Sequence, residues 1–460
     1  MRGMSRRWKI ALAILLVLIV LAAGGIWWAT SDHIERLPVT PAQRALADQA
    51  ARAGATDVDA NGRRDGGMTI GGKIDGHQFA VAIPPRWNHQ ALLFAHGYSA
   101  PGSSVAVARD PIARDPGGSA LGIAYAQGFA VGHSAYDKAG VGVESGAENT
   151  LALKHLLDRL GVTRTYIAGG SMGGTITVAL IEQHPTDFAG ALAACGPASW
   201  QSEIGALTDF RALYNYFTRG TPYALPGAQS IKVSALSSEA PWLLHVAQPI
   251  WTAMQMKRLA KPVERLFLDA RKDPKGRAAT IIRNISSASN GEFRPEFASF
   301  AFPLVTIGLG QDDMVATMGG EVHDSRNEVY HSAYLSDAQN AALNRGIERV
   351  AADPKAVAYA MTWHEPSGRS PVKLVTIHNR IDSLVPYKRE TELAARMAAA
   401  GNSANLLALT VPPMVITLPG VSLPGYAHCG FTPDQTRVAW NSLRRWVETG
   451  VKPVVPAELH

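Results

Sequence analysis

Short apolar runs alternate with longer amphipathic runs in two parts of the chain. The short runs have the length of buried strands, and the longer runs repeat apolar residues at i, i+3 and i+4, as helices do. Strands are predicted at residues 68–74, 79–83, 91–95, 128–134, 164–169, 189–194, 372–377 and 414–418, and helices at 148–160, 172–184 and 433–448. Strands that alternate with helices predict an α/β protein: a mostly parallel sheet with helices on both faces.

The alternation stops between residue 197 and about residue 369. A segment of this length is more than the connection between two neighbouring strands requires, so we expect an insertion that forms a lid. Its aromatic and methionine side chains either line a site for an apolar acyl or aromatic group or form the core of the lid itself. They are Trp200, Phe210, Tyr214, Tyr216, Phe217, Tyr223, Trp242, Trp251, Met254 and Met256.

Residues 10–30 form an uncharged run rich in Leu, Ile and Val. At about 1.5 Å per residue a helix of this length can cross a bilayer core of roughly 30 Å. Basic residues precede the run and keep the N-terminus in the cytoplasm, so everything after it is expected to be exported. Those residues are Arg2, Arg6, Arg7 and Lys9.

Whether the run is cleaved stays open. Small residues at 22–25 suit a signal-peptide cleavage site, whereas Trp27 and Trp28 suit a membrane anchor at the interface. The product is either membrane-anchored with its catalytic domain outside the cytoplasm or periplasmic or secreted. Residues 1–33 are therefore predicted to be the basic end with the membrane or signal segment, and residues 34–65 a tether and a helix.

The composition excludes several classes of protein. The 460 residues are 47% hydrophobic and 18% charged, which is too apolar for a disordered chain or one that coats nucleic acid. The net charge of +6 lies partly in the basic N-terminus, so no nucleic-acid partner is expected. The spacing of the acidic residues and His323 between 312 and 324 fits no metal site, and neither a metal nor another cofactor is expected.

Gly169-Gly170-Ser171-Met172-Gly173 lies between a predicted strand and a predicted helix. Flanking glycines permit a tight turn that pushes the serine hydroxyl outward, and the helix N-terminus directs amide groups toward it. Ser171 is therefore the candidate nucleophile.

A serine nucleophile requires a general base and a carboxylate that orients the base. His428 lies in a glycine-flanked loop after the run 414–418, and Asp382 follows the strand 372–377 by a few residues. Glu203 is an alternative acid, since it follows the strand 189–194. We prefer Asp382 because of its flanking strand and the Val-Pro that follows.

The order Ser171, Asp382, His428 resembles that of the α/β-hydrolase superfamily, as does Asp382-x-x-Val385-Pro386. The strand 91–95 runs into His96-Gly97-Tyr98, which is similar to the oxyanion loop of that superfamily. The resemblance implies an eight-stranded sheet with residues 66–196 and 370–460 as the catalytic domain, and residues 197–369 as a lid inserted after the sixth strand. It also implies that the backbone amides of Tyr98 and Met172 stabilise an oxyanion.

Three further residues accompany this site. The imidazole of His96 is expected to support the oxyanion turn, together with Gly97, by hydrogen bonding to the backbone. Cys195 and Cys429 each lie just beyond a predicted strand, and Cys429 adjoins His428. In an oxidising compartment the two could form a disulfide, or both could be buried free thiols.

These residues predict an exported serine hydrolase that cleaves a small-molecule carboxylic ester through an acyl-enzyme. A serine peptidase of the same fold is the alternative, because a triad does not separate esters from amides. A membrane-tethered binding protein without catalysis is a third interpretation, which the complete set of Ser171, Asp382 and His428 disfavours.

Overall fold

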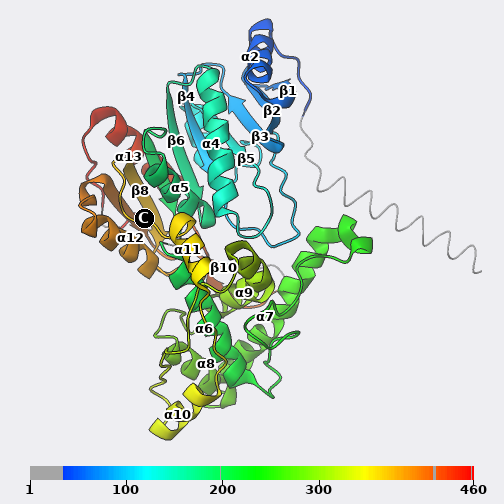
Figure 1. Ribbon diagram of the computed structural model, residues 1–460, viewed down its shortest axis with the longest axis vertical. Helices are drawn as coiled ribbons and strands as arrows, with labels where there is room; N and C mark the ends of the chain where they lie inside the picture. The colour runs from blue at the N-terminus through cyan, green and yellow to red at the C-terminus, as the bar shows by residue number, and fades with distance from the viewer. Residues whose placement is uncertain (1–34, 197, 418–420, 457, 460) are drawn as a thin grey trace, which may run out of the picture.

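The computed structural model describes residues 35–196, 198–417, 421–456 and 458–459 (Figure 1). The run 10–30, predicted as an anchor or signal, lies outside these residues. Within the described ranges, no helix combines the length and apolarity that crossing a membrane demands.

Nine strands form the main sheet, in the order β1-β2-β3-β5-β4-β6-β7-β8-β9. The first three and β5 pair antiparallel, and the strands from β5 to β9 pair parallel to one another. The strands are β1 (Thr56–Gly62), β2 (Met68–Ile74), β3 (His77–Ile83), β4 (Gln90–Ala95), β5 (Ala130–Ser134), β6 (Arg164–Gly170), β7 (Gly190–Ala194), β8 (Lys373–Asn379) and β9 (Leu406–Val411).

The prediction of a mostly parallel α/β sheet is confirmed, but the count of eight strands is wrong. The additional strand is β1, which follows helix α2 (Pro41–Arg52) in the segment expected to be a tether and a helix. Its sequence alternates polar residues with only two short apolar side chains, Val58 and Ala60, and most of it is exposed or half-buried. An edge strand of this kind is held by its backbone ladder with β2, which leaves only a weak hydrophobic signal in the sequence.

The last strand of the sheet was also misplaced. The run predicted as a late strand contributes only the short β10 (Val415–Thr417), which pairs with β11 (Pro424–Tyr426) in a separate two-stranded sheet. The ninth strand of the main sheet is β9, directly upstream. Periodicity alone cannot decide which of two neighbouring apolar runs joins the main sheet.

Side chains of the central strands alternate between two cores, as a strand buried on both faces requires. In β4, Leu93 belongs to one core and Leu92 to the other. The first core includes α4 (Val143–Arg159), α5 (Met172–Gln183) and α12 (Lys388–Ala399), and the second α3 (Ala120–Ala126) and α13 (Pro433–Thr449).

A helical unit follows β7, the sixth strand when the additional edge strand is left out, and ends before β8. Figure 1 shows it beyond the carboxyl ends of the parallel strands. Its elements are α6 (Trp200–Thr218), η1 (Trp242–Ala247), α7 (Gln248–Lys272), α8 (Arg277–Ala288), α9 (Phe297–Met318), α10 (Asp337–Gly346) and α11 (Pro354–Trp363).

Candidate active site

Ser171 lies in the turn between β6 and α5, with φ 55° and ψ −126°. A residue with a Cβ rarely adopts a positive φ, and such strain costs about 1–3 kcal/mol. The turn is held on both sides, because the Ser171 amide donates to Ala194 O at 2.9 Å and the Gly174 amide donates to Ser171 O at 2.8 Å. The hydroxyl therefore stands clear of the backbone at the carboxyl end of β6.

The glycines around Ser171 allow α5 to lie directly against the sheet. A Cβ on Gly173 would lie 1.9 Å from Ala95 O in β4, and a Cβ on Gly169 would lie 2.1 Å from Gly173 O. No side chain fits at these distances. The two glycines are thus required by the close approach of helix and strand, as the turn prediction implied.

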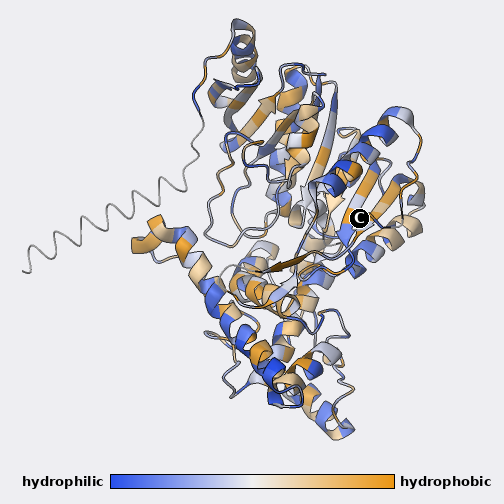
Figure 2. Ribbon diagram, turned by 180° about the vertical axis from the view of Figure 1, so that it is seen from behind, coloured by the Kyte–Doolittle hydropathy of each residue, from blue (hydrophilic) through white to orange (hydrophobic). Residues whose placement is uncertain are grey.

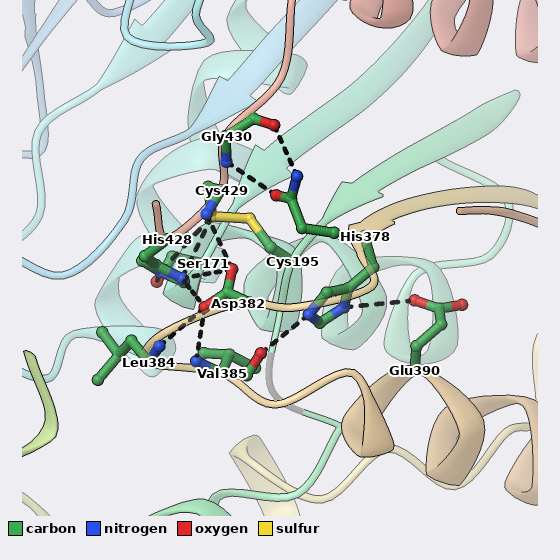
Figure 3. The surroundings of a disulfide bond; sticks show 11 residues. Ser171, Cys195, His378, Asp382, Leu384, Val385, Glu390, His428, Cys429 and Gly430 are labelled. Atoms are coloured by element: carbon green, nitrogen blue, oxygen red, sulfur yellow. Dashed lines mark hydrogen bonds and ion pairs between the residues drawn. A yellow bond between two sulfur atoms is a disulfide. The ribbon is translucent and has the colours of Figure 1, made fainter. Parts of the chain in front are cut away.

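Three side chains from distant parts of the chain form one hydrogen-bonded series (Figure 3). The Ser171 hydroxyl lies 2.8 Å from His428 Nε2, and His428 Nδ1 lies 2.8 Å and 3.0 Å from the two oxygens of Asp382. A carboxylate can only accept, so Nδ1 carries the proton and Nε2 is free to accept the proton of the serine. The structure brings together all three residues that the sequence singled out.

The carboxylate of Asp382 is buried and has several donors. It accepts hydrogen bonds from the amides of Leu384, Val385 and Cys429, each at 2.9 Å, besides the imidazole of His428. Burial by itself would raise its pKa, but His428, the nearby His378 and the amide of Cys429 outweigh burial, and the pKa of Asp382 lies below its usual value. Asp382 therefore stays ionised beside His428.

Asn379 at the end of β8 supports the loop that carries His428. Its side-chain amide donates to Gly430 O at 2.7 Å, and its side-chain oxygen accepts from the Gly430 amide at 2.8 Å. The sequence analysis missed this residue. The signal available in the sequence was a polar residue between a predicted buried strand and the Asp382 loop, where a polar side chain needs hydrogen-bond partners.

The structure joins Cys195 and Cys429 in a disulfide, with their Cα atoms 5.5 Å apart (Figure 3). Cys195 follows β7 and Cys429 follows His428, so the bond connects the histidine loop to the strand next to the nucleophile. Both residues have a positive φ, 44° and 54°, so the disulfide joins two sharp turns. Of the two alternatives for these cysteines, a disulfide or two buried free thiols, the structure contains the disulfide.

The loop after β4 closes on Ser171. A Cβ on Gly97 would lie 3.3 Å from the Cβ of Ser171. The ring of His96 stacks on Tyr136 at 3.7 Å between centroids, and its Nδ1 lies 3.0 Å from Gly97 O. Burial lowers the pKa of His96, which favours the neutral imidazole. His96 thus packs as a support of the turn that positions Tyr98.

Helix α9 of the inserted unit lies against this loop. A Cβ on Gly310 would lie 2.5 Å from the Tyr98 hydroxyl oxygen, so the tyrosine ring packs on the helix backbone. One turn further along, Asp313 accepts from Lys138 Nζ at 2.5 Å and from the Val141 amide at 2.7 Å. These contacts fasten the inserted unit to the edge of the sheet where Ser171 lies.

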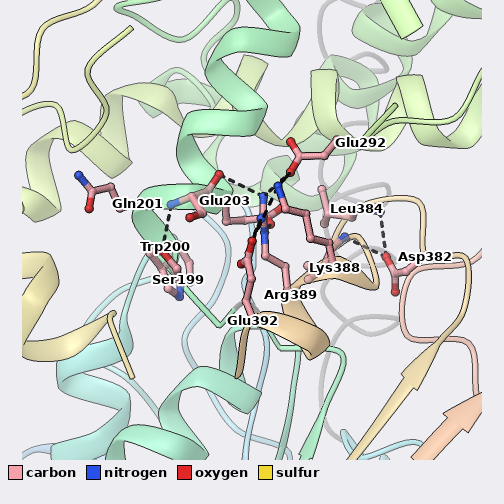
Figure 4. A network of polar contacts seen from close by, with 12 residues as sticks. Ser199, Trp200, Gln201, Glu203, Glu292, Asp382, Leu384, Lys388, Arg389 and Glu392 are labelled. Carbon is pink, nitrogen blue, oxygen red and sulfur yellow. Dashed lines mark hydrogen bonds and ion pairs between the residues drawn. The ribbon is translucent and has the colours of Figure 1, made fainter. Parts of the chain in front are cut away.

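Glu203, the alternative acid, has a different partner (Figure 4). Its carboxylate accepts from Arg389 Nε at 2.8 Å, and both side chains are buried. Arg389 also pairs with Glu292 and Glu392, so the network joins α6 and the segment before α9 to α12. Glu203 therefore anchors the inserted unit, while Asp382 holds His428.

The aromatic and methionine residues singled out in the inserted unit divide into three groups by burial. Trp200, Phe210, Tyr214 and Tyr223 are buried, and Phe210 packs on Phe293 and Phe300 at 4.4 Å and 4.9 Å between centroids. The half-buried residues are Tyr216, Phe217 and Trp251, and the exposed ones are Trp242, Met254 and Met256. The buried residues thus favour the interpretation that these side chains form a core rather than a substrate site.

The acidic residues between 312 and 324 have protein partners rather than a common centre. His323 pairs with Asp209 at 2.9 Å, and Asp324 pairs with Arg326. Among the described residues, the group closest to a ligand set is Asp382 and His428 with the two cysteines, whose sulfur atoms are bonded to each other. This arrangement offers two ligands at most and does not fit a structural zinc site.

No protein-family model and no curated protein matches the sequence. Solved structures similar to the chain include feruloyl esterase B from Aspergillus oryzae, at 14% identity and a TM-score of 0.46, which covers 89% of this chain and 91% of that one. Another is an esterase from Aspergillus oryzae, at 14% identity and 0.43, with 84% and 81% covered. A hydrolase described as putative, from Legionella pneumophila, has 12% identity and 0.42, with 89% and 96% covered.

Because these scores are low, the fold assignment depends on the topology. Without β1, the strands follow the chain except that β5 lies between β3 and β4. The serine turn follows the fifth strand of that set, and the inserted unit follows the sixth. Serine, aspartate and histidine occur in the order typical of this architecture. The chain has the α/β-hydrolase fold.

Proposed function

We propose that this protein is a serine hydrolase that cleaves a carboxylic ester through an acyl-enzyme. The observation that carries the proposal is the hydrogen bond of 2.8 Å between Ser171 Oγ and His428 Nε2, with Asp382 on the opposite nitrogen. A hydroxyl without such a base is a poor nucleophile at neutral pH.

In this mechanism His428 removes the proton of Ser171 as the hydroxyl oxygen attacks the ester carbonyl. Asp382 stabilises the imidazolium that forms. The amides of Tyr98 and Met172 donate to the oxyanion, which forms beside the N-terminus of α5. The imidazolium then protonates the leaving alcohol, and a water molecule activated by His428 hydrolyses the acyl-enzyme.

The proposal includes a location outside the cytoplasm, membrane-anchored or released. The support is the disulfide between Cys195 and Cys429, since such bonds persist in oxidising compartments and are rare in the cytosol. The basic residues before the apolar run 10–30 agree with export. The inserted unit, residues 197–369 in the sequence analysis, is proposed as the lid over an apolar acyl or aromatic group.

The decisive experiment replaces the nucleophile. Ser171→Ala should lower hydrolysis of a p-nitrophenyl ester by at least about a thousandfold and abolish labelling by a fluorophosphonate, while the melting temperature changes little. Ser403→Ala, at an exposed serine in η2 (Ser403–Asn405), is the matched control and should retain wild-type activity. Full activity of Ser171→Ala would refute the assignment of the nucleophile.

Substrate class requires a second measurement. The wild-type protein should hydrolyse esters faster than peptide amides with the same acyl group, and a series of acyl lengths should show what the lid accepts. Faster cleavage of the amides would replace the ester hydrolase with a peptidase. Absence of both activities, together with absence of fluorophosphonate labelling, would favour a binding protein.

A further inference from the structure

The most exposed apolar surface of the inserted unit lies at the start of α7. Figure 2 shows η1 and the adjoining end of α7 as a hydrophobic projection away from the rest of the molecule. We call this surface the apolar tip, and none of the η1 residues within it is buried. Its members and their exposed fractions are Trp242 77%, Leu243 69%, Leu244 45%, Val246 70%, Ile250 47% and Met254 54%.

An exposed surface of this kind is unusual for a soluble protein and marks a site of interaction. Other exposed apolar residues of the inserted unit, such as Val329, Tyr334 and Met361, are scattered singly, whereas those of the apolar tip are consecutive or one helical turn apart. The apolar tip therefore lacks an explanation in the packing of the chain itself.

Basic residues predominate next to the apolar tip. From residue 240 to residue 263 the sequence contains no aspartate or glutamate, while Lys257, Arg258 and Lys261 follow the apolar residues along α7. These cations line a surface groove of about 970 Å³ that also includes Met254, and basic residues outnumber its two carboxylates, Glu264 and Asp269. Lys261 pairs with Glu264 at 3.1 Å, and Arg258 donates to the neutral Gln255 at 2.8 Å. Apolar residues followed by cations are complementary to an anionic lipid surface.

The described chain begins on the side of the molecule where the apolar tip would meet a membrane. In both Figure 1 and Figure 2, residues 35–40 and the apolar tip lie on the same side of the molecule. Only residues 31–34 separate Glu35 from the predicted membrane run. At roughly 3.5 Å per residue, they can hold the domain no further than about 20 Å from a bilayer in which that run is anchored.

We propose that the apolar tip inserts into the interfacial region of an anionic bilayer, and that Lys257 and Arg258 contact the phosphate groups of its lipids. An amphipathic segment binds such a surface through buried apolar area together with the attraction of its cations. The site is separate from the Ser171 centre and does not depend on the proposed hydrolase activity.

The apolar tip also connects to the loop that carries Tyr98. A Cβ on Gly102 would lie 3.0 Å from Gln248 Nε2 and 2.8 Å from Glu239 Cγ, so the base of the projection contacts the loop four positions after Tyr98. Binding of the apolar tip to lipid would thus hold the loop over the candidate active site close to the bilayer surface.

The test uses the full chain in vesicles, with a fluorophore sensitive to polarity at an introduced cysteine. Leu243→Cys carries the label in the apolar tip, and Val329→Cys is the matched control, at a residue 78% exposed outside α7. The described cysteines form a disulfide and leave the introduced thiol for labelling. In vesicles that contain phosphatidylglycerol with brominated acyl chains, we expect about twofold or stronger quenching at Leu243→Cys and little at Val329→Cys.

A second comparison tests the contribution of charge to membrane binding. Lys257→Gln with Arg258→Gln, combined with Leu243→Cys, should weaken quenching in phosphatidylglycerol vesicles and change it little in phosphatidylcholine vesicles. If Leu243→Cys with Lys257 and Arg258 retained is quenched equally in both lipids, the assignment of an anionic surface is overturned. An unquenched label with a water-like spectrum in phosphatidylglycerol would overturn insertion, and a blue shift without bromolipid quenching would assign the apolar tip to a protein contact such as a second copy.

Discussion

The positive φ of Ser171 is maintained by its neighbours. Hydrogen bonds from the Ser171 amide to Ala194 O and from the Gly174 amide to Ser171 O fix the turn from two sides. The same turn directs the hydroxyl toward His428. At this residue, backbone strain and side-chain reactivity therefore have one structural cause.

Asp382→Asn should lower kcat for ester hydrolysis by about 10³ to 10⁴, because an amide group no longer selects the imidazole tautomer that leaves Nε2 free. Every orientation of the asparagine also places its NH₂ group against at least one donor, since both oxygens of Asp382 accept from donors. Asp434→Asn, at an exposed surface pair, is the control and should keep wild-type kcat. A loss below tenfold in Asp382→Asn would contradict the role of this carboxylate.

The same variant has a pH signature. The pKa of Asp382 is lowered in the folded protein, so its stabilisation is complete above the ordinary value of 3.8 and is lost as the pH falls through the lower folded pKa. Asp382→Asn should therefore flatten the dependence of the free energy of unfolding on pH below about pH 4. Denaturant titrations of both proteins across that range provide the measurement.

At the scale of the elements, α5 lies so close to β4 and β6 that only glycine fits at the contact. Gly170 and Gly173 flank the same serine turn, but the space around them differs. A Cβ on Gly173 would collide with Ala95 O, whereas nothing lies within 4 Å of a Cβ on Gly170. The contact of helix and strand thus depends on one of these two glycines.

Gly173→Ala should destabilise the fold by more than about 3 kcal/mol or prevent soluble expression, because backbone must shift to relieve the collision. Gly170→Ala is the matched control and should change the melting temperature little. Thermal unfolding of both variants provides the comparison. Equal melting temperatures would show that α5 can move away from β4 at little cost.

At the scale of the whole molecule, two groups of polar contacts beside the site help to hold the inserted unit on the sheet. Asp313 receives hydrogen bonds from Lys138 and Val141 on one side of the site. Arg389 joins Glu203, Glu292 and Glu392 on the other. These contacts add to a hydrophobic core that the inserted unit shares with the sheet, because buried residues of β4 and α6 belong to one cluster.

Asp313→Ala should loosen this attachment by about 1–3 kcal/mol, because it leaves the Val141 amide without its acceptor and Lys138 Nζ with Thr317 Oγ1 alone. Hydrogen exchange should become faster in α9 and stay unchanged in α4. Asp324→Ala, which removes a surface pair with Arg326, is the control and should leave exchange in α9 as it is. Protection of α9 that is identical in all three proteins would contradict the attachment.

Local sequence patterns predicted most elements of the fold. The hairpin of β2 and β3, the strand before Ser171 and the helix after it agree with the periodicity and the turn residues, because these features depend on neighbours in the sequence. The prediction missed the strand β1 and took the run at β10 instead of β9 as the late strand. An edge ladder and a short hairpin have little apolar pattern of their own.

The sequence by itself determined the α/β class and the three residue types that a serine hydrolase requires, because motif and order are properties of the chain. Only the tertiary structure decided that Asp382 rather than Glu203 holds His428, and that Asn379 and the disulfide fix its loop. Parallel strands bring their carboxyl ends to one edge, but which side chains meet there depends on distances and burial that no linear pattern contains. The exposure of the apolar tip is of the same kind, since a hydrophobic run becomes a surface only when the packed fold leaves it uncovered.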